Sequence, residues 1–248
     1  ALKTANHFKN ATITIITKNE KNECNTKYAQ GGISTVWDKT VDSFEQHIED
    51  TLIAGDGICD EKIVNMVVKD APARLQELID WGTQFDKNSD GNYSLGREGG
   101  HSQDRVLHHK DITGAEIERA LIQQVENTEN ITFLTYHYAI DLITEHQLKQ
   151  KPIKRKEKIT CFGAYVLDEK KSIVKTFSAK VTMLATGGNG QVYNTTTNPI
   201  IATGDGIAMA YRAKAEISDV EFIQFHPTAL YNPGEYPAFL ISEAVRGE

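Results

Sequence analysis

The chain has few cysteines, the residues that stabilise small secreted folds through disulfides or bind zinc. Its three cysteines, Cys24, Cys59 and Cys161, stand far apart among 248 residues, so the sequence holds neither a CxxC pair nor a Cys/His cluster, and we expect no metal site. An odd number of separated cysteines favours reduced thiols and a cytoplasmic protein. No apolar run reaches the ~18–20 residues that a membrane helix needs, so we expect no membrane segment.

Positive charge is also scarce. The 27 Lys and Arg residues are outnumbered by 34 Asp and Glu residues, and a net charge of -7 gives a nucleic-acid-binding role no electrostatic support. The basic stretch at residues 149–158 is interpreted as a solvated surface loop, because the rest of the chain is acidic; a phosphate or nucleic-acid patch is the alternative. A chain of this length can bury a sizeable core without disulfides or metals.

Hydrophobic periodicity predicts strands that alternate with helices early in the chain and with hairpins later. Strands are expected at residues 11–17, 131–135, 139–144, 162–167, 173–177 and 181–185. Helices are expected at residues 1–5, 43–54 and 206–214, after Asp60, from Pro72 to Gly82, and after Thr113. Ser43 with Gln46, and Thr113 with Glu116, fit capping boxes at two helix starts. The mixture predicts an α/β fold, with a parallel sheet and an antiparallel β insert.

Four separated segments combine glycines with hydroxyl, amide or acidic side chains: residues 25–32 (NTKYAQGG), 185–188 (ATGG), 203–206 (TGDG) and 225–228 (FHPT). Paired glycines let backbone amides approach a ligand closely, and a strand that runs into glycines is typical of cofactor binding in doubly wound folds. Each segment alone has a plainer reading: a surface loop, a tight turn, a helix cap or a structural histidine.

In this order and spacing, the four segments resemble the flavoprotein family of fumarate reductases, succinate dehydrogenases and L-aspartate oxidases along essentially the whole chain. The resemblance implies a Rossmann-like FAD-binding domain at residues 1–228 and the beginning of a capping domain at residues 229–248. The family's N-terminal GxGxxG fingerprint is missing, and we expect it to lie in a βα unit upstream. The resemblance implies contacts with FAD at Lys18, Asn25, Thr26, Lys27, Tyr28, Ala29, Gln30, Gly31, Gly32, Thr186, Gly187, Gly188 and Asp205.

Two positions separate the branches of this family. Asn25 stands where members with covalent flavin carry histidine, so the resemblance implies noncovalent FAD. Glu98, in REGGHS, resembles a glutamate of the aspartate oxidase branch that faces the substrate ammonium group; without the resemblance it reads as an exposed loop acid. His226 resembles the histidine that holds a substrate carboxylate. Ser242 and Glu243 stand where the capping domain usually has Thr-Glu.

The resemblance thus implies a cytoplasmic enzyme that oxidises L-aspartate to iminoaspartate, with oxygen or fumarate as acceptor. The product would feed quinolinate and NAD biosynthesis, which makes quinolinate synthase a candidate partner. A soluble fumarate reductase or succinate dehydrogenase flavoprotein is one alternative, and a noncatalytic flavin-fold module is another. The family's proton-transferring arginine would fall beyond Glu248, so we expect the isolated chain to bind FAD poorly and to be inactive.

Overall fold

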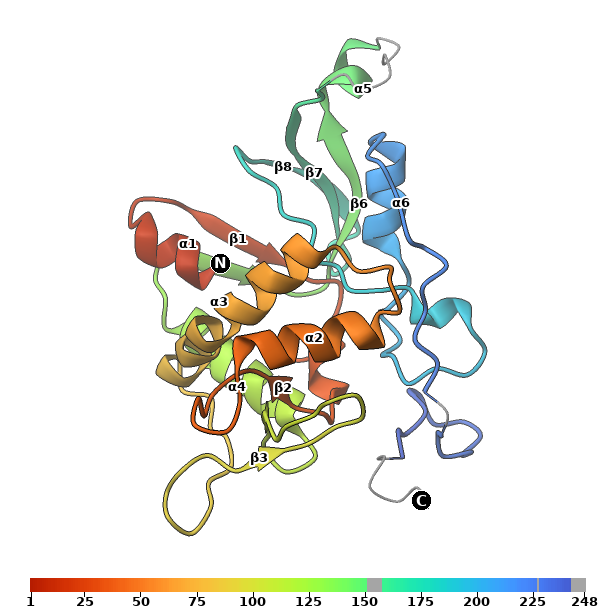
Figure 1. Ribbon diagram of the computed structural model, residues 1–248. Coiled ribbons are helices and arrows are strands. Elements are labelled where there is room, and N and C mark those ends of the chain that lie inside the picture. The colour runs from red at the N-terminus through yellow and green to blue at the C-terminus, as the bar shows by residue number, and fades with distance from the viewer. Residues whose placement is uncertain (151–157, 227, 242–248) are drawn as a thin grey trace. The chain divides into compact units, whose positions relative to one another are not determined.

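The computed structural model describes residues 1–150, 158–226 and 228–241, which form two compact units (Figure 1). The first unit consists of Ala1–Asn25 together with Val125–Glu248, and the second consists of Thr26–Gln124. The chain therefore passes between the units inside the glycine-rich segment of residues 25–32. The expected boundary between residues 228 and 229 stays a prediction.

The first unit is built from both ends of the chain. Its elements are α1 (Leu2–His7), β1 (Ile13–Ile16), β5 (Ile131–Leu134), β6 (His137–Thr144), α5 (Glu145–Lys149), β7 (Cys161–Asp168), β8 (Ile173–Ser178), the 3-10 helix η2 (Gly190–Val192) and α6 (Asp205–Arg212). β1 and β5 pair in parallel, with Ile13 opposite Ile131. β6, β7 and β8 form an antiparallel sheet with β7 in the centre. The predicted parallel sheet and antiparallel insert are both confirmed.

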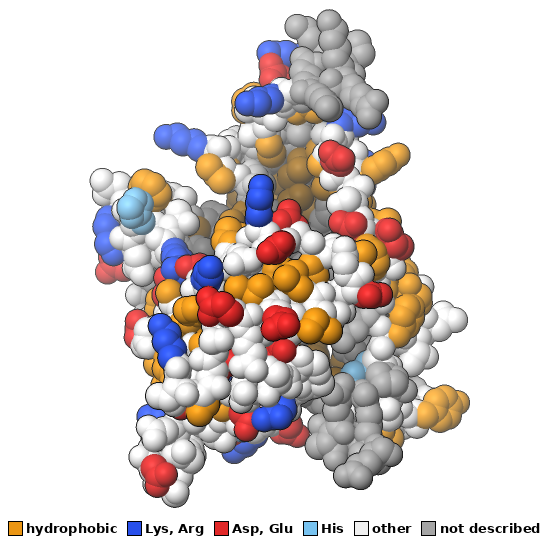
Figure 2. Space-filling model, viewed as in Figure 1, with side chains coloured by type: hydrophobic (Ala, Val, Ile, Leu, Met, Phe, Trp, Pro, Cys, Tyr) orange, Lys and Arg blue, Asp and Glu red, His pale blue; other side chains and the backbone are white. Residues whose placement is uncertain are grey.

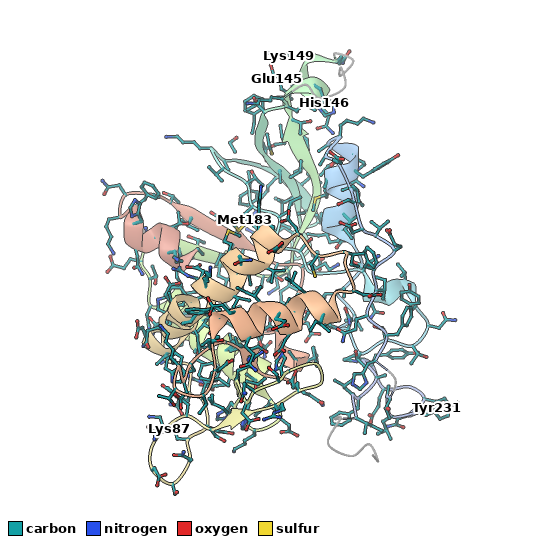
Figure 3. All side chains as sticks on the ribbon, in the orientation of Figure 1. Lys87, Glu145, His146, Lys149, Met183 and Tyr231 are labelled. Atoms are coloured by element: carbon teal, nitrogen blue, oxygen red, sulfur yellow. The ribbon has the colours of Figure 1, made fainter. Side chains whose placement is uncertain are left out.

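One face of β6 is covered by α6, as Figure 1 shows. Leu142 of β6 packs against Met209 of α6 and Ala213 just beyond it, and all three side chains are buried. α5 follows β6 directly, and its side chains Glu145, His146 and Lys149 lie together in Figure 3. The sheet thus buries apolar side chains of β6 against a helix.

The second unit combines helices with short strands. Its elements are the 3-10 helix η1 (Thr26–Tyr28), β2 (Ile33–Ser34), α2 (Phe44–Ala54), α3 (Glu61–Asp80), β3 (Leu95–Gly96), β4 (Val106–Leu107) and most of α4 (Thr113–Glu126). β4 pairs antiparallel with both β2 and β3. The core of this unit joins Leu75 of α3, Phe85 and Leu107 of β4.

Local signals set several helix boundaries as predicted. The Ser43 hydroxyl accepts a hydrogen bond from the Gln46 amide at 3.1 Å, and Asp60 accepts from the amides of Lys62 and Ile63. Each contact satisfies an amide that the first turn of a helix leaves unpaired. Gly82 follows the end of α3 with a φ of +96°, a conformation that glycine adopts without strain.

Two predictions at helix starts are wrong. Pro72 begins no helix, because α3 runs through it from Glu61 to Asp80. The helix buries Val68 and Leu75 on either side of the proline, and this burial offsets the backbone hydrogen bond that proline cannot make. The Thr113 capping box is also absent, because the threonine hydroxyl accepts from the His109 amide and Glu116 accepts from the amide of Gln84.

The predicted strand at residues 181–185 is also wrong, since this segment has no regular secondary structure. Val181 and Met183 are 84% and 82% exposed, and Figure 3 labels Met183. β-branched and apolar residues form a strand only when a neighbouring strand pairs with them. Among the described residues, no strand pairs with this segment.

The surface shows no segregation of charge by sign on the face drawn in Figure 2, where acidic and basic side chains are interspersed. Of the basic stretch at residues 149–158, residues 151–157 lie outside the described part of the chain. Among the residues that the structure describes, no helix combines the length and the apolar character needed to cross a membrane.

Candidate functional site

The glycine-rich segment continues in the second unit as a tight loop against α4. The Ala29 amide donates to the Thr26 carbonyl at 3.0 Å, and the Gly114 amide donates to the Ala29 carbonyl at 3.0 Å. A Cβ on Gly114 would lie 1.8 Å from the Thr26 carbonyl oxygen, so only glycine lets the first turn of α4 come this close. Sequence analysis missed Gly114, although a glycine in the first turn of a helix is a signal of close packing.

Gly31 and Gly32 meet different neighbours. A Cβ on Gly32 would lie 2.2 Å from the Leu107 carbonyl oxygen, so the loop packs directly on β4. Gly31 faces Glu98, whose Oε1 would lie 3.2 Å from an added Cβ. The same Oε1 accepts a hydrogen bond from the Gly32 amide at 3.4 Å. The fold thus brings together two predicted site segments, the glycine loop and Glu98.

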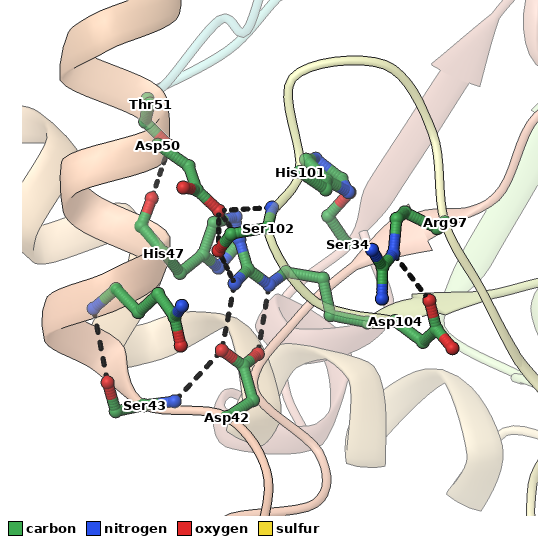
Figure 4. Close-up of polar contacts among 12 residues, drawn as sticks. Ser34, Asp42, Ser43, His47, Asp50, Thr51, Arg97, His101, Ser102 and Asp104 are labelled. Atoms are coloured by element: carbon green, nitrogen blue, oxygen red, sulfur yellow. Dashed lines mark hydrogen bonds and ion pairs between the residues drawn. The ribbon is translucent and has the colours of Figure 1, made fainter.

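Glu98 belongs to an exposed loop of residues 97–104 that joins β3 to β4 (Figure 4). At the base of this loop, Arg97 pairs with Asp104 at 2.7 Å, and the side chains of both residues are more than half exposed. Further along, Ser102 donates to Oδ2 of Asp50 through its amide at 2.9 Å and through its hydroxyl at 2.8 Å. Since Asp50 lies on α2, these two hydrogen bonds attach the loop to a helix.

Arg105 connects this attachment to the interior of the unit. Its side chain is 0% exposed, and it donates to both carboxylate oxygens of Asp42, at 2.9 and 2.8 Å, and to Asp50 at 2.5 Å. Burial raises the pKa of Asp50, but hydrogen bonds from Ser102 and Arg105 outweigh it and leave the pKa below its ordinary value. At neutral pH the network therefore holds one guanidinium between two carboxylates, a charge-assisted arrangement.

Two histidines lie beside this network. The rings of His47 on α2 and His101 on the loop meet edge to face, with their centroids 5.9 Å apart. His47 is buried, and burial, followed by the charge of the nearby Arg105, lowers its pKa. His101 Nε2 lies 3.4 Å from the Ser34 hydroxyl of β2. We expect His47 to be neutral at pH 7.

A second polar cluster lies in the first unit, just after the end of β1 and at the start of α6. Lys18 forms an ion pair with Asp205 and donates to the Thr203 hydroxyl at 2.5 Å, while Tyr138 of β6 donates to Asp205 at 3.0 Å. Burial opposes ionisation of Asp205, but the hydrogen bonds from Lys18 and Thr203 outweigh it and lower its pKa. The predicted pair Lys18 and Asp205 is thus brought together, and Tyr138 is an addition that sequence analysis missed.

Close backbone contacts surround this cluster. Gly187 has a φ of +70°, and a Cβ there would lie 2.6 Å from Nδ2 of Asn25; a Cβ on Gly206 would lie 1.9 Å from the Thr186 hydroxyl. The Asn25 Oδ1 atom is buried and accepts no hydrogen bond from the described residues. A buried acceptor without a donor is costly, so this atom marks a place where a ligand donor fits.

His226 lies in a loop of the first unit, and its Nδ1 is 2.9 Å from the Thr228 carbonyl oxygen. Nearby, the rings of Tyr193 and Phe225 meet edge to face with centroids 5.3 Å apart. Ser242 and Glu243, the other predicted catalytic residues, lie outside the described residues.

The chemistry of these groups suits a flavin nucleotide. Within the first unit, the close approaches at Gly187 and Gly206 and the unsatisfied Asn25 oxygen offer room for a ligand and a polar partner, and Lys18 with Asp205 offers charge and hydrogen bonds for an adenosine end. Within the described part of the chain, no group of three or more His, Cys, Asp or Glu side chains gathers as a metal site would require.

Comparison with known proteins gives the class first. Residues 1–248 match the family described as FAD binding domain, and this chain belongs to that family, whose cofactor is FAD. A quinol-fumarate reductase from E. coli has the same fold, with a TM-score of 0.75 and 28% identity over 84% of this chain and 34% of that chain.

Two curated relatives are more similar in sequence to this chain than that reductase is. An L-aspartate oxidase, chloroplastic, from Arabidopsis thaliana is 48% identical over 97% of this chain and 37% of its own length. An L-aspartate oxidase from Yersinia pestis is 45% identical over 100% of this chain and 45% of its own length. The chain thus spans less than half the length of these curated relatives.

Proposed function

We propose that this chain is the FAD-binding part of an L-aspartate oxidase, which oxidises L-aspartate to iminoaspartate with oxygen or fumarate as acceptor. The relatives named L-aspartate oxidase support this assignment. The structural observation that carries it is the contact between Glu98 and the glycine loop at Gly31 and Gly32. An acidic group beside a flavin loop matches an ammonium-bearing substrate, whereas succinate has no cation to pair with it.

In this proposal Glu98 orients the substrate. Its carboxylate would accept hydrogen bonds from the ammonium group of L-aspartate and so place the α-carbon toward the flavin. The hydrogen bond from the Gly32 amide, at 3.4 Å, would help to keep the carboxylate over the glycine loop. FAD, when bound, would supply the redox chemistry as the hydride acceptor.

His226 would hold a substrate carboxylate. Its Nδ1 lies 2.9 Å from the Thr228 carbonyl oxygen and 3.3 Å from the Thr228 amide nitrogen, so the Thr228 backbone helps to fix the ring. We propose that His226 binds a substrate carboxylate through its imidazole ring, with Ser242 and Glu243 contributing from residues 229–248, the beginning of the capping domain.

The proposed FAD contacts follow the two polar clusters. Lys18 and Asp205 would bind the adenosine end, and the loop from Asn25 to Gly32 would line the pyrophosphate and the ring system, with Thr186, Gly187 and Gly188 beside it. Asn25 cannot form the histidine-flavin bond of covalent family members, so the FAD would be noncovalent. We further propose quinolinate synthase as the enzyme that uses the product, and the cytoplasm as the compartment, although the plant relatives are named chloroplastic.

The specific alternative is a fumarate reductase or succinate dehydrogenase flavoprotein, because a quinol-fumarate reductase shares the fold with a TM-score of 0.75. Substrate choice separates the two. In air, the full-length gene product should release peroxide with L-aspartate and none with succinate. Peroxide or dye reduction with succinate alone would move the protein to the alternative.

Replacement of Glu98 tests whether the activity depends on the proposed substrate site. Glu98→Gln removes the charge but keeps the side-chain shape, so the KM for L-aspartate should rise about tenfold to a hundredfold, as for loss of a hydrogen bond between charged groups. Asp90→Asn, at an exposed turn of the same unit, is the matched control and should leave KM unchanged. Equal kinetics for wild type and Glu98→Gln would contradict the assignment of Glu98.

A further inference from the structure

The loop that carries Glu98 is exposed, so something outside the loop must fix its position. Glu98 is followed by Gly99 and Gly100, and Gly100 has a φ of +85°, so the tip has little intrinsic rigidity. The turn is closed by a single hydrogen bond from the His101 amide to the Glu98 carbonyl, at 3.2 Å. The loop contacts the rest of the unit through Glu98, which accepts from the Gly32 amide, through His101, which lies beside Ser34 and His47, and through Ser102, which is attached to Asp50. The Arg97–Asp104 pair lies within the loop.

The Arg97–Asp104 pair and the attachment of Ser102 to Asp50 differ in strength. The Arg97–Asp104 pair joins two exposed side chains of the same loop, and such surface pairs contribute little. Asp50 has a side chain that is only 12% exposed, and it receives both the amide and the hydroxyl of Ser102 on one oxygen. The buried Arg105 guanidinium donates to that same oxygen at 2.5 Å, which holds the carboxylate itself in place.

We propose that Asp50 is a positioning residue for substrate choice: with its carboxylate held by Arg105, it anchors Ser102 to α2 and so places Glu98 against the glycine loop, where Glu98 discriminates amino dicarboxylates from plain dicarboxylates. The inference rests on the proposed function for its substrate, but its geometry lies wholly within the second unit (Figure 4). Asp50 touches no substrate in this scheme; it acts on substrate choice through Ser102 and the loop.

The test compares Ser102→Ala with Asp104→Asn in the full-length gene product. Ser102→Ala removes one of the two hydrogen bonds that Ser102, an exposed residue, donates to Asp50, so the fold should survive. The KM for L-aspartate should rise about tenfold, as expected for a slight misplacement of an orienting group. The inhibition constant for succinate, which has no ammonium group, should stay within about twofold of wild type. Asp104→Asn should change neither constant.

A double-mutant cycle distinguishes a positioning role from a merely structural one. In a Glu98→Gln background, Ser102→Ala should add nothing to KM, because the group that it positions has already been lost. Additive effects, or a matching loss of succinate binding, would overturn the proposal. Asp50→Asn should behave like Ser102→Ala with a larger effect, because it weakens both hydrogen bonds from Ser102.

Hydrogen exchange provides a measurement that needs no substrate. Amides of residues 97–102 should exchange about tenfold faster in Ser102→Ala than in wild type, and at the wild-type rate in Asp104→Asn. Unchanged exchange in Ser102→Ala would overturn the anchoring role even if L-aspartate is the substrate. Faster exchange in a protein that fails to oxidise L-aspartate would instead retain the anchor and reject the proposed function.

Discussion

Replacing Asp42 with asparagine measures how much the buried ion pair with Arg105 stabilises the second unit. The side chains of Arg105 and Asp42 are 0% and 2% exposed, and two hydrogen bonds at 2.9 and 2.8 Å join them. Removing one partner of a buried pair costs about 3–5 kcal/mol, because the remaining charge stays buried. Asparagine keeps one oxygen as an acceptor and Arg105 keeps Asp50, so we expect the lower end, about 3 kcal/mol.

The expected loss is large enough for a simple assay. At about 2–4 °C per kcal/mol for a protein of this size, Tm should fall by roughly 6–12 °C. The two tryptophans of the chain, Trp37 and Trp81, both belong to the second unit, so their fluorescence during urea unfolding reports on this unit.

Asp104→Asn is the matched control for this experiment, because it breaks an ion pair of the same unit whose side chains are 54% and 58% exposed. Its cost should stay within about 0–1 kcal/mol. If Asp42→Asn costs no more than Asp104→Asn, burial of the Arg105 charge does not stabilise this unit, and the reasoning is refuted.

Two further predictions concern the cofactor and pH. Gly187→Ala should lower the FAD content of the purified full-length gene product, since its Cβ would lie 2.6 Å from Asn25 in a conformation with φ of +70°. Gly57→Ala is the control, because Gly57 has a φ of +83° and its Cβ would meet nothing within 4 Å; equal flavin absorbance in both variants would argue against the contact. Stability should fall as pH drops below about 6.5, because the pKa of His47 is lowered by burial and the unfolded chain then binds more protons than the folded one. His47→Gln should flatten this dependence in urea titrations between pH 7 and pH 5, and an unchanged slope would exclude His47 as its source.

Local signals in the sequence predicted much of the secondary structure. Ser43 and Asp60 cap helices because their side chains reach amides only two or three residues away. The hairpin of β7 and β8 forms around the charged turn that follows Asp168. Such contacts depend on neighbours in the chain, so a sequence pattern contains the information needed to predict them.

The errors arose where distant contacts override local preference. Pro72 normally stops a helix, yet burial of Val68 and Leu75 carries α3 through it. The segment at residues 181–185 has strand-forming residues, yet among the described residues no strand pairs with it. Glu116 was expected to cap its own helix and instead binds the amide of Gln84. For Pro72 and Glu116, contacts with residues distant in the sequence decided the outcome. For residues 181–185, the lack of a partner strand decided it.

The candidate site likewise contains some residues that the sequence could identify and others that it could not. Lys18, Asp205 and Glu98 could be named from motifs, and the structure places the first two together and the third against the glycine loop. Tyr138 and Asp50 could not be named, because nothing in their sequence surroundings distinguishes them from ordinary strand and helix residues. Their roles exist only once β6 meets α6 and α2 meets the loop.

In the network around Arg105, Asp42 should mainly stabilise the fold and Asp50 should mainly position the loop. Asp42 is almost fully buried and contacts Arg105 through both oxygens, whereas Asp50 is partly exposed and divides its hydrogen bonds between Arg105 and Ser102. Asp42→Asn should therefore cost more stability than Asp50→Asn and disturb substrate choice less, while Asp50→Asn should show the reverse. Measuring unfolding free energy and the ratio of KM for L-aspartate to the inhibition constant for succinate in both variants tests this order. If one variant were worse in both measurements, Arg105 would act as a single structural unit and the loop would have no separate anchor.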